Sequence, residues 1–486
     1  MKKEKNGYIT LYLALLLGVM ISLVFILSES VRDETIRAEI EGVMDVALFS
    51  VFGEYNRQLL EQYDLFFVDT SYGEGAPRID KMEEHLQYYM NQNFEKEPSN
   101  GWFGFRDLTD LYCDNVEFER YRYASDEQGE VLKNQIIDYM QDKTGIESVE
   151  KTLIEFGILQ SGNYTQMDME SQWDMADETL DILVEEKKQE LIHLESEEDI
   201  NVELDNPADY IKNIKAQGIL GLAIPSEKSL SSVVIDSEEY FSHRKNFQGQ
   251  GVLKEEGSII DKVTEKYLFM EYLLEKCGTY FREKENSVLK YQVEYLLEGN
   301  VGDIENLEEV IEDILHIREG INFLYLISDE GKTAEADTLA WVVSTLLFSP
   351  EIKEAVKATI LFAWSYAESV KDIRILLEGH KLPLLKSDST WNTPLSQLLM
   401  FTSCLHQYEI LQEGVTYEDY LKFFLSLRSE KELISRFMDI CEMDIRETKG
   451  NEYFRMDGCI QAVKAKANVS SGYGNGYVIT RTYAYE

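Results

Sequence analysis

The stretch YITLYLALLLGVMISLVFIL, residues 8–27, decides how this chain is organised. It contains no charged residue, and as an α-helix rising about 1.5 Å per residue it would extend about 30 Å, the thickness of the hydrocarbon core of a bilayer. Lys2, Lys3 and Lys5 precede the stretch, and acidic residues follow it. The positive-inside rule therefore predicts a cytoplasmic N-terminus and an extracytoplasmic remainder.

A cleaved secretory signal is the alternative interpretation of this stretch. The apolar region of such a signal is usually about 7–15 residues long and ends in small residues before the cleavage site. The run in this chain is longer and ends in Leu-Ser-Glu-Ser, without an A-x-A pattern. We therefore expect a single-pass anchor in the cell membrane, with residues 1–7 in the cytoplasm, residues 8–27 in the membrane and the bulk of the chain outside the cell.

The charge balance excludes one large class of partners. The 486 residues include 90 acidic and 47 basic ones, a formal net charge of −43, and 44% of residues are hydrophobic. Such a chain can bury a sizeable core, but it would be repelled by nucleic acid and by anionic lipid beyond the N-terminal lysines. We interpret the acidity as a solubilising surface rather than as a cation site, because no acidic cluster has EF-hand spacing.

The five cysteines predict neither a disulfide scaffold nor a zinc ribbon. They are odd in number and widely separated, and no two of them form a C-x-x-C pair. We expect most of them to be buried as small hydrophobic residues.

Both ends of the chain predict strands near an amphipathic helix. Apolar residues at spacings of three and four, from Ile36 to Leu59, predict that the membrane helix continues as a stalk to about Gln62. Residues 63–69 form a short apolar run and residues 115–124 alternate, so both segments are predicted strands. Residues 460–469 and 477–485 also alternate, and the Ser-Ser-Gly-Tyr-Gly-Asn-Gly between them predicts a hairpin.

The middle of the chain is predicted to be mostly helical. An alternating segment at 289–295 predicts one strand there, and residues 206–257 are expected to be rich in loops after an acidic linker at 195–205. Ser349 as N-cap and Pro350 as first helical residue mark the start of one helix. The predicted helices are residues 130–143, 169–194, 260–277, 305–327, 334–348, 351–378, 417–427 and 430–446.

Together these segments predict an α+β fold. A transmembrane helix continues as a stalk helix, an antiparallel sheet combines early and C-terminal strands, and a large, mostly helical insertion separates them. We divide the chain into residues 28–128 (stalk and first strands), 129–257 (mixed helical and loop-rich), 258–448 (helical) and 449–486 (the hairpin returning to the sheet).

No catalytic constellation is present in the sequence. It lacks a G-x-S-x-G elbow, a Walker loop, an H-E-x-x-H motif and a G-x-G-x-x-G after a strand. The six histidines are scattered singly, and we interpret His316 as a solvated helix residue rather than a metal ligand. Trp341, Trp364 and Trp391 could line a ligand groove, but at helical spacing they are expected in the core. The sequence thus predicts a protein that is not an enzyme, with no cofactor, metal ligand or small-molecule substrate.

The N-terminal pattern of lysines, Gly7 and an apolar helix that becomes amphipathic resembles type IV pilins and pseudopilins. In particular it is similar to the minor pilin-like proteins of Tad (Flp) pilus systems. Several segments resemble an uncharacterised family of large membrane-anchored proteins of Gram-positive bacteria, often associated with Tad-like gene clusters. These segments are residues 45–69, IREGINFLYLISD (317–329), FAWSYAESVKDIR (362–374), GHKLPLLK (379–386) and FRMDGCI (454–460).

The resemblance implies a candidate processing site. A prepilin peptidase would cut between Gly7 and Tyr8, and the pilin pattern has Glu at the fifth position of the mature chain, where this sequence has Tyr12. That departure predicts an N-terminus that is mostly uncut, and a membrane-retained, minor or tip component rather than a major subunit.

The resemblance also implies a role in assembly. The chain would be a non-enzymatic, extracytoplasmic component of a Tad/Flp-type pilus or related secretion apparatus, with other pilin-like or Tad assembly proteins as its partners. Two alternatives stay open at this point: an anchored binding or sensor domain unrelated to pili, and an exported enzyme with an unfamiliar site.

Overall fold

Helix α1 (Lys5–Phe52) is one continuous helix of 48 residues. In the computed structural model its residues 8–31 are exposed throughout, and from Ile36 onward one face is buried. Ile36, Ile40, Met44 and Val51 carry that face, as their spacing predicts. Among the residues that the structure describes (5–95, 110–143, 169–194, 209–225, 228–250, 261–346, 350–472 and 474–485), α1 is the one helix long and apolar enough to cross a membrane.

The chain divides into two compact units. Residues 1–136, 244–259 and 441–486 form the first, which we call the sheet unit, and residues 137–243 and 260–440 form the second, the helical unit. Helices α4 (Glu130–Lys143) and α15 (Glu430–Arg446) contribute residues to both.

The stalk ends earlier than the apolar spacing predicts. A turn at Gly53 follows α1, and a second helix, α2 (Arg57–Tyr63), begins after Asn56, whose side chain accepts a hydrogen bond of 3.0 Å from the Leu59 N–H. Leu59 is buried, but on α2. The prediction of a single helix to about Gln62 was wrong because apolar spacing can continue in phase across a capped turn.

The predicted strand at 63–69 is also mostly wrong. Tyr63 ends α2, Asp64 takes a left-handed φ of 53°, and only β1 (Val68–Asp69) pairs in a sheet. Leu65 and Phe67 are buried without joining a ladder. An apolar run indicates that a segment is buried, but it does not by itself indicate that the segment pairs in a sheet.

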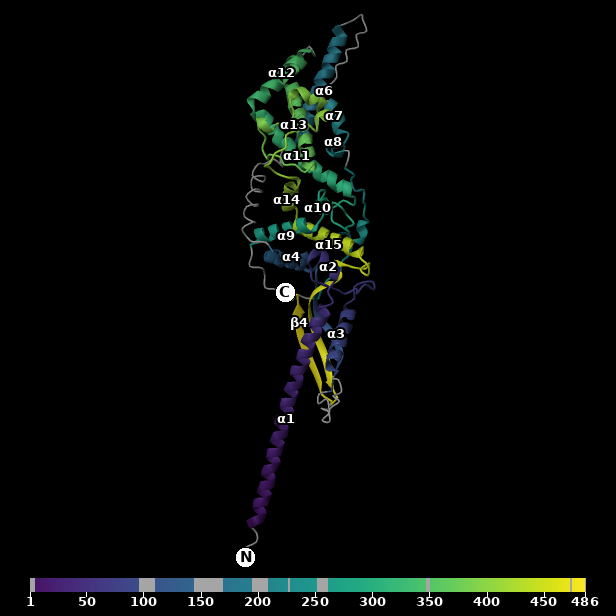
Figure 1. The fold of residues 1–486 in the computed structure, drawn as a ribbon, viewed down its shortest axis with the longest axis vertical. Coiled ribbons are helices and arrows are strands. Elements are labelled where there is room, and N and C mark those ends of the chain that lie inside the picture. The colour runs from purple at the N-terminus through teal and green to yellow at the C-terminus, as the bar shows by residue number, and fades with distance from the viewer. Residues whose placement is uncertain are drawn as a thin grey trace. The chain divides into compact units, whose positions relative to one another are not determined.

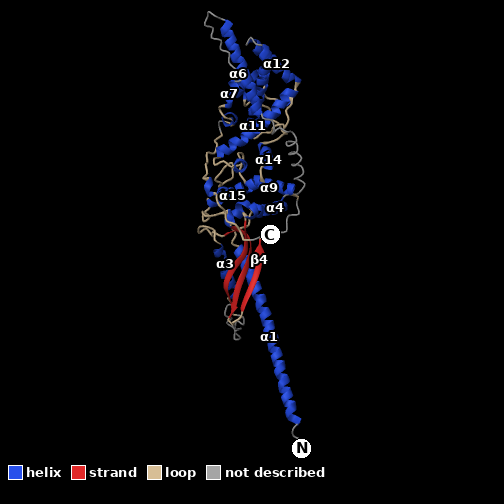
Figure 2. Cartoon of the chain, turned by 180° about the vertical axis from the view of Figure 1, so that it is seen from behind, coloured by secondary structure: helices blue, strands red, loops and turns tan. Residues whose placement is uncertain are grey.

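Four antiparallel strands form one sheet, in which β3 (Cys459–Ser471) is central. Strand β2 (Leu111–Tyr123) pairs along one edge of β3, while β1 and β4 (Gly476–Ala484) pair with its other edge. The prediction that early and C-terminal strands share an antiparallel sheet is confirmed (Figure 2). The predicted hairpin is present as well, and Gly474 in its turn has a φ of +88°, which glycine adopts without strain.

One face of the sheet packs against two helices. Val463, Ala465, Ala467 and Val469 alternate along β3 toward a core that also contains buried residues of α1 and α3 (Ile79–Phe94). Figure 1 shows α1 and α3 beside the strands. The two alanines leave room for the helices to lie close to the sheet, so α1 is part of this core.

The helical unit is built around α13 (Lys353–Leu377), which contacts several other helices. Predicted helices 130–143, 169–194, 417–427 and 430–446 are confirmed to the residue, and the others within a few residues. Ser349, the predicted N-cap, and the predicted linker 195–205 lie outside the described residues. Pro350 begins a 3₁₀ turn that precedes α13. The other helices that the structure describes in this unit are α6 (Met169–Leu194), α7 (Asp209–Lys215), α8 (Ile219–Ala223), α9 (Lys262–Lys276), α10 (Gln292–Glu298), α11 (Asp303–Ser328), α12 (Glu330–Leu346) and α14 (Tyr417–Leu427).

The described parts of the two units also contain 3₁₀ helices. These are η1 (Asp126–Gly129), η3 (Ser237–Glu239), η4 (Phe241–His243), η5 (Pro350–Ile352), η6 (Asp388–Thr390), η7 (Leu395–Cys404) and η8 (Met456–Gly458).

The strand predicted at 289–295 is wrong, because α10 occupies most of that segment. Tyr291, Val293 and Tyr295 are buried as the alternation requires, but the intervening Gln292 and Glu294 are buried too. Their side chains accept hydrogen bonds from the Gly278 and Tyr280 N–H groups, at 2.9 and 3.0 Å. The polar residues of the pattern bind buried backbone rather than solvent, so the alternation does not reflect a strand with one exposed face.

Candidate functional site

The buried half of α1 is fixed to strand β4 by polar contacts. The Tyr477 hydroxyl donates to Asp33 at 2.8 Å, and Arg481 donates to Glu41 at 2.6 Å and to Asp45 at 3.1 Å. Tyr477 and Arg481 are four positions apart in β4, and side chains at even spacings along a strand project from the same side. The strand thus contacts α1 along about three turns of the helix.

Aromatic side chains hold the end of the same helix. The Phe52 ring lies 4.6 Å from that of Tyr483 and 5.0 Å from that of Tyr485, between ring centres. The Tyr485 hydroxyl also donates to the Phe52 carbonyl. Each large apolar side chain of α1 in this core contributes about 1.5–3 kcal/mol. The apolar segment of α1 is therefore continuous, within one helix, with the core of the sheet unit, and its length and composition fit a single-pass anchor or a signal sequence.

The residues of the candidate processing site lie at the start of α1. Gly7, Tyr8 and Tyr12 all belong to its first turns, and the side chains of Tyr8 and Tyr12 are 76% and 66% exposed. The geometry brings no described side chain to them, as expected for a segment that faces lipid or another protein. That the Gly7–Tyr8 bond is mostly uncut stays a prediction.

A cluster of buried charges occupies the helical unit. Arg318 on α11 donates to Asp372 on α13 at 2.8 and 3.0 Å, and Lys386 donates to Asp372 at 2.7 Å and to Glu368 at 2.5 Å. The Asn322 side-chain amide donates a further hydrogen bond to Asp372, at 3.0 Å. All five side chains are buried.

The protonation states in this cluster follow from its pairing. Burial alone would raise the pKa of Asp372, but Lys386 and Arg318 hold that pKa below its usual value. Burial lowers the pKa of Lys371, which donates to the Asn392 carbonyl at 2.9 Å. The charges tie residues 383–392 to α11 and α13, and no face of the cluster is open to a substrate.

The sequence analysis missed this cluster. Three of the segments that carry the resemblance, 317–329, 362–374 and 379–386, supply its charged residues. One signal could have revealed it: Glu368, Lys371 and Asp372 continue a helix whose preceding turns are apolar on all sides. Charges on such a helix need buried partners.

The tryptophans, His316 and the cysteines singled out from the sequence agree with their predicted burial in most cases but not in all. Trp364 is buried as predicted and Trp391 is partly buried, but Trp341 is 59% exposed, so its assignment to the core was wrong. His316 is exposed on α11, and four of the five cysteines are buried. Within the described residues, no group of three or more His, Cys, Asp or Glu side chains is arranged to hold a metal ion.

These features define an α+β protein whose described residues include one candidate membrane-spanning helix, continuous with the core of its sheet unit. Residues 197–471, more than half of the chain, match a family of unknown function, DUF5702, and the chain belongs to that family. The match includes the buried charge cluster and β3, while α1, β1, β2 and β4 lie outside it. No curated protein and no solved structure matches the chain.

Proposed function

We propose that this protein is a non-enzymatic, membrane-anchored extracytoplasmic component of a Tad/Flp-type pilus or related secretion apparatus. The observation that carries the proposal is the division of α1. Its first half is apolar and exposed over the length of a bilayer, and its second half belongs to the core beneath an antiparallel sheet.

This division of one helix is the arrangement that the resemblance to pilins implies. The contacts of Tyr477, Arg481 and Phe52 prevent the sheet unit from turning independently of α1. The orientation of the exposed half of α1 therefore sets the orientation of the sheet unit. Any partner that packs against the exposed half would therefore orient the sheet unit. Such coupling suits an assembly component and has no evident use in a simple tether.

The distribution of charges supports the orientation. Lysines precede the apolar run and acidic residues follow it, which favours retention of the N-terminus in the cytoplasm. The strongly acidic remainder suits an exported surface.

The buried charge cluster supports a role without catalysis. A catalytic group must touch its substrate, but Arg318, Asp372 and Glu368 are fully enclosed and paired. Their arrangement suits stabilisation of the helical unit.

Fractionation of the native host tests the anchor and its orientation. We expect the full chain to stay in membranes after a high-salt wash, with the region after α1 digested by protease added outside intact cells. Leu16→Arg with Val19→Arg places two charges near the centre of the span, at a cost of about 2.5–3.5 kcal/mol each, and should release the chain from membranes or abolish its insertion. Val31→Arg, which is beyond the apolar run, is the matched control. Full-length protein in the soluble fraction would overturn the anchor.

Cross-linking from the exposed half of α1 tests the assembly role. A photoreactive residue at Val24 is expected to capture pilin-like or polytopic platform proteins of a Tad-type system in native membranes. The same photoreactive residue at Phe49, an exposed position beyond the apolar run, captures partners of the sheet unit instead. Comparing the two positions distinguishes partners within the membrane from partners outside it. An anchored chain that captures no such protein from either position would favour a binding or sensor domain unrelated to pili.

A further inference from the structure

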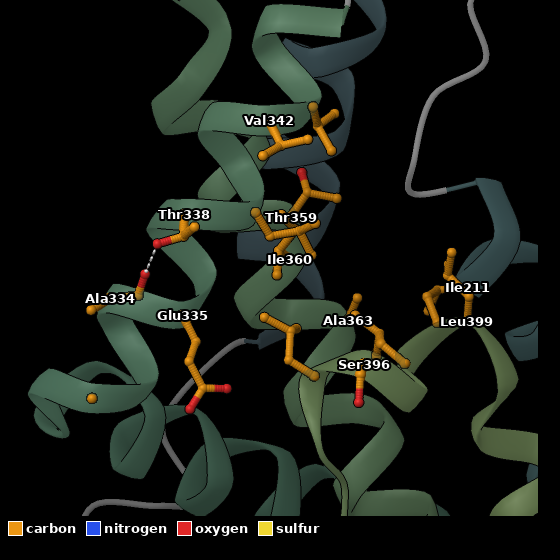
Figure 3. Close-up of a pocket in the computed structure, with 15 residues that line it drawn as sticks. Ile211, Ala334, Glu335, Thr338, Val342, Thr359, Ile360, Ala363, Ser396 and Leu399 are labelled. Carbon is orange, nitrogen blue, oxygen red and sulfur yellow. Dashed lines mark hydrogen bonds between the residues drawn. The ribbon is translucent and has the colours of Figure 1, made fainter.

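A cavity of about 760 Å³ opens in the helical unit beside α12 and α13, and it belongs to no part of the proposed function. The 3₁₀ segment η7 closes one side of it with Leu395, Leu398 and Leu399. Its volume falls within the range of pockets that hold small organic ligands, roughly 300–1,000 Å³. Figure 3 shows its lining side chains.

The walls of this cavity are aliphatic. Eight of its fifteen lining residues are Leu, Ile or Val. The hydroxyl groups of Thr338 and Thr359 donate to the Ala334 and Ala355 carbonyls of their own helices, at 2.8 and 3.1 Å. Those two threonines therefore have no hydroxyl hydrogen left to donate to a ligand, and an alkyl chain is the group that such walls bind best.

One carboxylate determines which end group that chain can carry. Glu335 is the single charged residue of the lining, and in the view of Figure 3 its carboxylate lies, like the Ser396 hydroxyl, below the apolar residues Val342 and Ile360. Lys332 Nζ is 3.9 Å from the Glu335 carboxylate, at the limit of an ion pair, and it also lies 5.3 Å from the centre of the Trp364 ring. At 3.9 Å the Lys332 ammonium offsets the Glu335 charge only in part, so a carboxylate end group would be repelled by Glu335, whereas an ammonium group would pair with it.

We propose that this cavity binds an amphiphile with a single alkyl chain and a cationic amine end group, the chain packing between α12, α13 and η7 and the amine lying beside Glu335. The inference does not rest on the proposed role in pilus assembly. Two acidic side chains of a neighbouring hollow, Glu330 and Asp337, lie on the same helix, but neither lines this cavity, and Asp337 is already paired with Lys353 at 2.7 Å. Glu335 is therefore the carboxylate that selects the end group.

Photolabelling of the full chain in lipid nanodiscs tests the proposal. The probes are diazirine derivatives of dodecylamine, dodecanol and dodecanoate, which share one chain and differ only in the end group. We expect the amine to label peptides of α12 and η7 at least about fivefold more than the carboxylate, with the alcohol between them. Labelling of α1, which contacts lipid in every sample, is the internal standard.

Two variants with matched controls locate the ligand. Val342→Trp fills the cavity from an exposed position and should abolish labelling of η7, whereas Thr345→Trp, on the same helix but outside the lining, should leave it unchanged. Glu335→Gln should bring the amine-to-carboxylate ratio to within about twofold of one, and Glu354→Gln should not. Hydrogen exchange of α12 and α13 verifies that each variant is folded. Labelling confined to α1, equal labelling by amine and carboxylate in the wild-type chain, or labelling that survives Val342→Trp would overturn the proposal.

Discussion

Glu294 is a buried carboxyl group that forms no ion pair with a described residue. Its Oε1 atom accepts hydrogen bonds from the Tyr280 N–H at 3.0 Å and the Tyr417 hydroxyl at 2.8 Å, and its Oε2 atom has no partner among the described residues. Burial raises the pKa of Glu294 to about 7, although these two donors act in the opposite direction. The folded helical unit therefore binds a proton at Glu294 that the unfolded chain releases above about pH 4.5.

This shift predicts a pH-dependent loss of stability. A raised pKa in the folded state stabilises the protein below the unfolded pKa, and the contribution is lost as the pH rises through the folded pKa. Between about pH 4.5 and 7, Glu294 alone should remove about 3 kcal/mol. Glu294→Gln keeps the Oε1 acceptor and removes the titration, so its urea midpoint, followed by tryptophan fluorescence of the full chain in nanodiscs, should depend less on pH. Parallel pH profiles for the two proteins would contradict the prediction.

Asp372 is the opposite case, a buried carboxylate with two cations. Asp372→Asn leaves Arg318 and Lys386 without their shared counter-charge, and breaking such a pair costs about 3–5 kcal/mol. We expect this loss in the most protected amides of α11 and α13 by hydrogen exchange. Asp337→Asn removes a partly exposed partner of Lys353 and should cost at most about 1 kcal/mol. Equal effects of the two changes would show that the buried cluster does not stabilise the unit.

At the scale of elements, the sequence predicts best where one periodicity is supported by capping. Helix α14 is one such case, since Thr416 and Asp419 form a reciprocal capping box at its start. The errors arise where a local pattern has two structural causes. The alternation at 289–295 came from two polar side chains that bind buried backbone, and the apolar run at 63–69 came from buried, irregular chain that follows α2.

The candidate sites were harder to predict than the elements. The charge cluster unites Arg318, Asp372 and Lys386, and the cavity unites α12, α13 and η7, over separations that no local pattern encodes. The long apolar N-terminal helix was predicted because its signal is confined to one segment and depends on composition alone.

The position of β4 predicts that the last strand is essential to the sheet unit. It covers an edge of β3 and supplies Tyr477 and Arg481 to the contact with α1, and Tyr485, the residue after the strand, adds its hydroxyl hydrogen bond to Phe52. Deleting residues 472–486 should therefore unfold the sheet unit rather than trim a tail, since the lost contacts are a large share of a typical stability of about 5–15 kcal/mol.

Hydrogen exchange of the deletion in nanodiscs measures this effect. Amides of α3 and β2 should lose their protection, while α11 and α13 keep theirs because they belong to a separate core. Thr480→Ala with Thr482→Ala, on the exposed side of β4, is the matched control and should change protection little. Retained protection of β2 after the deletion would contradict the argument.

For the whole molecule, the fate of the N-terminus decides whether α1 acts as an anchor or as a mature pilin helix. Cleavage after Gly7 would create a charged amine on Tyr8, at the edge of the apolar run. In pilins the Glu at the fifth mature position neutralises such an amine, but Tyr12 at that position has no carboxylate to do so. With the proposed topology, an unpaired charge in this layer would cost several kcal/mol, so we expect the uncut chain, whose lysines would stay at the cytoplasmic surface, to be the more stable arrangement.

We therefore expect mass spectrometry of the protein from native membranes to recover peptides that span the Gly7–Tyr8 bond as the main N-terminal species. Gly7→Leu removes the small residue that a prepilin peptidase requires and should leave this pattern unchanged. Tyr12→Glu restores the missing carboxylate and is the variant in which cleaved chains should increase. A wild-type chain that begins at a methylated Tyr8, and that Gly7→Leu converts to the uncut form, would show that α1 is processed as a pilin helix despite Tyr12.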